Sequence, residues 1–197
     1  MKVNFIKLSI FGLAFILLSA VGSAKELKSD ELNYSITVPD GWIVDFQSPN
    51  GFSITNPDKK RSITLIIGNA KSGMLDSNYV AQFEQVLHKA GVQIVSSKFF
   101  TIDGAPAYET VQRIGKASFA SVIVDLQIIA NNKFYDLGTS VIGGDATQDS
   151  EMKKRLASFH FLQPPKLSRF NFLGVKLTVV GIIIVGIIFW AIQRRKT

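Results

Sequence analysis

The chain has 197 residues, no cysteine and a formal net charge of +7 at pH 7. The lack of cysteine excludes disulfides and thiolate metal ligands. The positive charge lies at the two ends, because residues 25–165 hold 14 lysines and arginines against 15 carboxylates, a net charge of −1. The composition therefore gives no support to a nucleic-acid-binding surface.

Residues 1–24 have the pattern of a secretory signal peptide. Lys2 and Lys7 precede the apolar stretch 8–21, and small residues at 21–24 fit a signal-peptidase site. As a helix this stretch rises only roughly 21 Å, short of the ~30 Å hydrocarbon core of a bilayer. We expect cleavage after Ala24, with an uncleaved anchor as the alternative. In either case the domain that follows is exported.

Short runs of alternating apolar and polar residues follow, which predict strands with one buried face. In the first run Leu32, Tyr34, Ile36 and Val38 share one side of a strand. Asn50-Gly51 predicts a hairpin. The first strands are expected at residues 32–38, 42–47, 52–55 and 62–68.

A helix is expected at residues 77–90, where apolar side chains recur every three or four residues and Gly91 provides the stop. Strands are expected again at residues 92–102, 107–114, 118–130 and 134–141. A second helix is expected at 147–158, with Asp145 as its cap and Met152, Leu156 and Phe159 facing inward.

Seven or so strands joined mainly by hairpin turns predict an antiparallel sheet, and two amphipathic helices need its faces to cover. The predicted fold is therefore α+β, a central antiparallel sheet of about seven strands flanked by two amphipathic helices. This extracytoplasmic domain is expected to span residues 25–165.

The carboxyl end predicts a membrane anchor. Residues 166–172 form a juxtamembrane linker, and 173–193 are long enough as a helix to span roughly 30 Å. Residues 194–197 form a basic cytoplasmic tail. We expect a single-pass protein of the cytoplasmic (inner) membrane, with its domain on the periplasmic or extracellular side.

The domain shows no catalytic, cofactor-binding or metal-binding pattern. His88 is expected to be a solvated helix residue, and His160 a partly buried, hydrogen-bonded one. Trp42 is expected at the edge of the core, although a binding-surface aromatic is the alternative. Gly143-Gly144-Asp145 is expected to be a connection rather than an anion site. No catalytic residue, cofactor or metal site is therefore expected.

Several motifs resemble the PsbP-like superfamily, which includes PsbP and exported bacterial proteins such as DcrB. They are the run Tyr34-Ser35-Ile36-Thr37-Val38-Pro39-Asp40-Gly41-Trp42, then Asn56-Pro57, then Asp103-Gly104-Ala105-Pro106-Ala107-Tyr108, and the closing Ala157-Ser158-Phe159-His160-Phe161. The resemblance covers about residues 30–162. It implies an antiparallel sheet flanked by helices, and accessory and binding roles rather than catalysis.

The expected function is that of a non-catalytic, membrane-anchored accessory or adaptor protein that binds a protein partner at the membrane surface. The alternative is a carrier or sensor domain for a small molecule or lipid, also tethered to the membrane. An enzyme has the least support, because no nucleophile with a base and no pair of catalytic carboxylates can be named.

Overall fold

The computed structural model describes residues 24–48, 50–115 and 120–167. The predicted transmembrane helix at 173–193, the basic tail and all of the predicted signal peptide except Ala24 lie outside these residues. Within the described ranges, no helix is long and apolar enough to cross a membrane.

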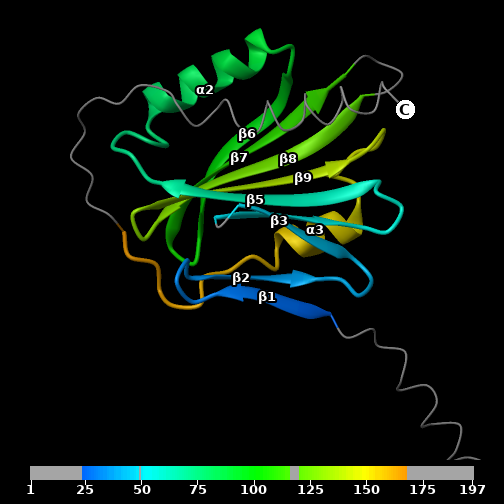
Figure 1. Ribbon diagram of the computed structural model, residues 1–197. Helices are drawn as coiled ribbons and strands as arrows, with labels where there is room; N and C mark the ends of the chain where they lie inside the picture. Colours follow the sequence, from blue (N-terminus) through cyan, green and yellow to red (C-terminus); the bar gives the residue numbers. More distant parts are fainter. Residues whose placement is uncertain (1–23, 49, 116–119, 168–197) are drawn as a thin grey trace, which may run out of the picture.

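Seven strands form one antiparallel sheet, in the order β3-β4-β5-β9-β8-β7-β6 (Figure 1). This confirms the predicted sheet of about seven strands. Its strands are β3 (Ile43–Ser48), β4 (Gly51–Thr55), β5 (Arg61–Asn69), β6 (Gln93–Ile102), β7 (Ala105–Ile114), β8 (Ser121–Ala130) and β9 (Lys133–Val141). After β5 the chain crosses to the far edge and returns by hairpins, so that β9 pairs with both β8 and β5.

A separate hairpin of two strands, β1 (Lys25–Ser29) and β2 (Tyr34–Val38), packs on the large sheet. The sequence did not predict β1, because Lys-Glu-Leu-Lys-Ser contains one apolar side chain and gives no alternating pattern. Strand β2 begins two residues later than expected. Asn33 has a φ of 52°, a turn conformation that ends the β1–β2 connection.

Helix α2 (Ser77–Lys89) covers one face of the large sheet over β6 and β7, as Figure 1 shows. Its bounds agree with the predicted helix. Asp76 caps it by accepting a hydrogen bond from the Tyr79 main-chain N–H at 2.7 Å. Phe83 and Leu87 of α2 pack with Val92 and Tyr108 in a small apolar cluster under the helix.

Helix α3 (Ser150–Leu156) and the β1–β2 hairpin lie on the opposite face of the large sheet (Figure 1). The predicted cap at Asp145 is wrong. Asp149 caps α3 by accepting hydrogen bonds from Glu151 and Met152 at 3.0 and 3.1 Å. Asp145 instead accepts from the Thr147 main chain and hydroxyl, at 2.7 and 2.6 Å.

Pairing with the sheet explains the late start of α3. Asp145 forms a bridge with Val122 of β8, and the Ala146 N–H donates to the Val122 carbonyl at 2.9 Å. The chain is therefore held on β8 at Asp145 and Ala146, and residues 146–148 form a turn before the helix begins. Met152 and Phe159 are buried and Leu156 is partly buried, as expected from their inward positions.

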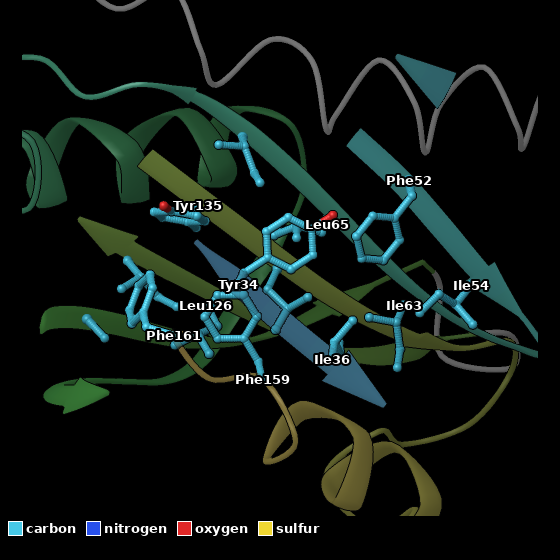
Figure 2. Close-up of a cluster of buried hydrophobic side chains, with 14 of the residues drawn as sticks. Tyr34, Ile36, Phe52, Ile54, Ile63, Leu65, Leu126, Tyr135, Phe159 and Phe161 are labelled. Atoms are coloured by element: carbon cyan, nitrogen blue, oxygen red, sulfur yellow. The ribbon is translucent and has the colours of Figure 1, made fainter. Parts of the chain in front are cut away.

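The main core fills the space between the large sheet, the hairpin and α3. Aromatic rings join its parts, as Figure 2 shows. The ring of Phe161 lies 5.3 Å from that of Tyr135 and 5.6 Å from that of Phe159, while Tyr34 of β2 stacks on Phe159 at 6.4 Å. Burial of this apolar surface is the principal stabilising term in a chain without disulfides.

Candidate functional site

Both histidines lie at the surface of the domain. His88 is exposed on α2, as expected. His160 is exposed rather than partly buried, because Phe159 and Phe161 occupy the two inward positions beside it. Its Nδ1 lies 3.1 Å from the Ser158 carbonyl oxygen. In the part of the chain that the structure describes, no three carboxylates or histidines gather in a way that could hold a metal.

The other two candidates have structural roles. Trp42 is half-buried against the main core, which confirms its expected place at the core edge. Gly143 and Gly144 lie in the connection between β9 and α3, and Asp145 follows them in a turn. Because α3 begins only at Ser150, these residues do not form the amino end of a helix, in agreement with the expected connection.

The C-terminal strap, residues 158–167, is fixed along one end of the domain. At its start, Ser35 and His160 exchange two main-chain hydrogen bonds of 2.9 and 3.0 Å. The Phe161 N–H donates to the Asp103 carboxylate at 2.8 Å. These bonds attach the strap to β2 and to the β6–β7 turn.

Two asparagines hold the rest of the strap. Asn33 accepts from the Gln163 N–H at 2.8 Å and donates through its amide to the Gln163 carbonyl at 3.1 Å. Asn131 accepts from the Lys166 N–H at 2.8 Å, and its own N–H donates to the Lys166 carbonyl at 2.9 Å. The chain therefore leaves the domain beside the β8–β9 turn.

The chain enters the domain at the opposite end. Lys25 pairs with Val38 and Ser29 pairs with Tyr34, so the first described residues lie at one end of the β1–β2 hairpin and its turn at the other. In Figure 1 the first described residues and the orange strap lie at opposite ends of this hairpin. Entry and exit are thus separated by the length of the hairpin.

Strand β6 forms one edge of the large sheet, and in the described ranges it pairs only with β7. Val95 and Phe99 are 50% and 57% exposed on it. Natural edge strands are protected by charged side chains, prolines, β-bulges or a covering segment. Here Lys98 is engaged, since its Nζ lies 3.0 Å from Glu109 Oε1 and 5.5 Å from the centre of the Phe100 ring.

Strand β3 forms the other edge, with Ile43 and Phe46 exposed on it. It is shorter than β6 and its register shifts between Asp45 and Ser48. The ring of Phe46 contacts that of Phe52 at 6.4 Å. The pairing of β6 with β7 also shifts, between Ile94 and Ser96, but then runs without interruption from Ser96 to Ile102, a longer stretch than any in β3.

A buried acidic pair, Asp125 of β8 and Asp136 of β9, lies on the sheet face that α2 covers in part. Gln127 pairs across the strands with Asp136 and with Tyr108, and Asp125 precedes it by two residues, so all these side chains share one face. Asp125, Gln127 and Asp136 are 3%, 2% and 4% exposed.

Hydrogen bonding around the acidic pair is incomplete. The Gln127 amide nitrogen donates to Asp125 Oδ2 at 3.4 Å, and the two carboxyl groups are hydrogen-bonded to each other. Gln127 Oε1 and Asp136 Oδ1 have no partner among the described residues. No described lysine, arginine or histidine forms an ion pair with either carboxyl group.

Burial raises the pKa of both carboxyl groups, because water no longer stabilises their charged forms. The neighbouring charge of Asp125 raises the pKa of Asp136 further. Burial, and then the charges of Asp136 and Asp125, also raise the pKa of Tyr79 on α2. The sequence analysis missed the pair, although one signal was present: polar Asp125 and Gln127 alternate with apolar residues in a strand that is otherwise apolar.

No protein-family model matches the sequence, and no curated protein matches it. Among solved structures, the fold is similar to that of cyanobacterial PsbP (CyanoP) from Synechocystis sp. PCC 6803. The similarity covers 73% of this chain and 95% of that chain, with 14% identity and a TM-score of 0.53. A protein from Bacteroides thetaiotaomicron is similar over 71% of this chain and 49% of its own, with 13% identity and a TM-score of 0.50. The domain thus has a PsbP-like fold, as the sequence motifs predicted.

Proposed function

We propose that this protein is a non-catalytic accessory protein, anchored in the membrane by residues 173–193, whose exported domain binds a protein partner along the edge of β6. The observation that carries the proposal is the length of that edge and the side chains that it exposes. It is long, its pairing with β7 is regular from Ser96 to Ile102, it exposes Phe99, and its lysine is already paired with Glu109. Such an edge is suited to receive a strand from another protein.

The proposed geometry of that contact is strand addition, in which main-chain hydrogen bonds give affinity and side-chain contacts give specificity. The exposed ring of Phe99, which lies 4.7 Å from that of Tyr108, offers the apolar contact. The edge of β3 is a poorer receptor, because its uninterrupted pairing covers only Ile43 to Asp45, whereas that of β6 covers Ser96 to Ile102. The PsbP-like fold supports an accessory role, since the family resemblance implies such roles.

The strap supports the tethered arrangement. Lys166 is fixed at the β8–β9 turn, and only residues 167–172 separate it from the proposed span. Six extended residues reach roughly 20 Å at most. The β8–β9 end of the domain would therefore face the membrane at short range, and β6 would present its edge to a partner in or near the membrane.

Exposed aromatics on the two edges allow a matched test. Tagged full-length protein is isolated from native membranes as wild type, Phe99→Glu and Phe46→Glu, and co-purifying proteins are quantified. We expect Phe99→Glu to lose a stoichiometric partner that wild type and Phe46→Glu both retain. Equal thermal melting of the two variants shows that both are folded. Retention of the partner by Phe99→Glu would contradict the proposal.

A further inference from the structure

The acidic pair has no counter-charge among the described residues, and its hydrogen bonding is incomplete. Two carboxyl groups and an amide are nearly fully buried, and two of their oxygens have no partner in the described part of the chain. A buried acceptor without a donor is costly, and in a native protein it indicates an uncounted water or ion. Uncompensated negative charge favours an ion over a neutral water.

Neighbouring strands fix the oxygens on one side of the sheet. Gln127 of β8 lies directly opposite Asp136 of β9, and Gln127 and Asp125 are hydrogen-bonded at 3.4 Å. Gly138 lies opposite Asp125 and has no side chain; a Cβ there would be 3.8 Å from Asp125 Oδ1. The two carboxyl groups and the Gln127 amide therefore lie beside one another on one face of β8 and β9.

We propose that Asp125, Gln127 and Asp136 bind one hard metal cation between β8 and β9, with Ca²⁺ as the best fit. Carboxylate and amide oxygens are the ligands that Ca²⁺ takes in flexible geometry, whereas Mg²⁺ demands a near-ideal octahedron. The described surroundings provide neither histidine nor thiolate, which transition metals prefer. The cation supplies the missing positive charge and engages both unpaired oxygens.

Protons are the competing ligand. Two protons would also neutralise the acidic pair, and Tyr79 of α2 is the nearby titratable group that feels its charge. A cation binds the ionised carboxylates, whereas protons remove their charge. Cation binding therefore weakens as the pH falls. The pH dependence of binding thus separates the two ligands.

The experiment uses the full-length protein in detergent, freed of metal by a chelator. Calorimetric titration with Ca²⁺ and thermal melting with and without Ca²⁺ or Mg²⁺ are carried out near neutral pH on wild type, Asp136→Asn and Asp45→Asn. We expect one Ca²⁺ per chain and a higher melting temperature for wild type. Asp45→Asn, which alters an exposed carboxylate on β3, behaves as wild type, and Asp136→Asn loses both effects.

Gln127→Met tests the amide oxygen without a change of charge. We expect its Ca²⁺ affinity to fall at least about tenfold, the scale on which altered ligand shells weaken metal sites. Three results would overturn the proposal. In the first, neither Ca²⁺ nor Mg²⁺ affects the wild-type protein, while a lower pH stabilises it. This result would mean that protons alone neutralise the acidic pair. The others are unchanged Ca²⁺ binding in Asp136→Asn, or in a folded Gln127→Met.

Discussion

Asn131 and Lys166 exchange two hydrogen bonds, one in each direction. The Lys166 N–H donates to the Asn131 side chain at 2.8 Å, and the Asn131 N–H donates to the Lys166 carbonyl at 2.9 Å. Asn131 has a φ of 54°, a conformation that asparagine tolerates better than most residues. One turn residue thereby determines where the chain leaves the domain.

Replacement of Asn131 by alanine removes the acceptor for Lys166 and strains the turn. We expect Asn131→Ala to lower the free energy of unfolding by about 1–2 kcal/mol. Hydrogen exchange at the Lys166 amide should also become faster. Asn131→Asp keeps an acceptor oxygen and should be much less affected. Equal stability of the alanine variant and wild type in urea unfolding would show that the strap is not held by this contact.

A stop codon after Leu167 separates the domain from its proposed anchor. The truncated protein keeps every hydrogen bond of the strap, so we expect it to fold and to appear in the exported soluble fraction. The full-length protein should remain with the membranes after a high-salt wash. A full-length protein released by salt alone would contradict the anchor.

The acidic pair predicts an unusual pH dependence of stability in the metal-free protein. Burial raises the pKa of Asp125 from 3.8 to about 6 and that of Asp136 well above 3.8. At any pH between 3.8 and these raised pKa values, the folded protein binds more protons than the unfolded one. The free energy of unfolding therefore rises as the pH falls from neutral towards about 5. Urea unfolding should show a gain of roughly 1–3 kcal/mol.

The same experiment has an internal control. Burial opposes the ionisation of Asp149, but the hydrogen bond and charge of Arg61 and the main-chain N–H groups of Met152 and Glu151 together outweigh it and lower the pKa of Asp149. That contribution is lost only below the ordinary aspartate range, so it does not mask the gain above pH about 5. Asp136→Asn should flatten the profile and be more stable than metal-free wild type near neutral pH. Stability that falls steadily from neutral pH to about 5 would contradict the account.

Glu84 connects α2 to β7 and β6, because it accepts hydrogen bonds from the Tyr108 hydroxyl and, at 3.2 Å, from the Ser97 hydroxyl. We expect Tyr108→Phe to lower the free energy of unfolding by about 1–2 kcal/mol. Hydrogen exchange in α2 should become faster. Ser97→Ala, which removes an exposed contact, should have less effect. If exchange in α2 is unchanged in Tyr108→Phe, the hydrogen bond does not hold the helix.

The periodic spacing of apolar residues predicted the large sheet and α2, because in each of these elements the pattern lies within one short stretch of sequence. Strand β4 and helix α2 each carry an apolar face that neighbouring residues repeat. Strand β1 has no such face, since only Leu27 is apolar and most of the strand is exposed. The start of α3 depends on the bridge between Asp145 and Val122, which joins residues far apart in the sequence.

The candidate sites were less predictable for the same reason. Asp103 looks like an ordinary turn residue, and its hydrogen bond to Phe161 spans 58 residues. Asp125 and Asp136 meet only because β8 and β9 pair in one particular register. A sequence shows the type of each residue, whereas such contacts depend on how distant strands are aligned.

The most direct test of the central claim is native mass spectrometry of the tagged full-length protein, purified in gentle detergent from native membranes. We expect a stoichiometric protein partner that is present with wild type and Phe46→Glu and absent with Phe99→Glu. A protein that is recovered alone, or that carries only a lipid or small molecule, would contradict the accessory role and favour a carrier.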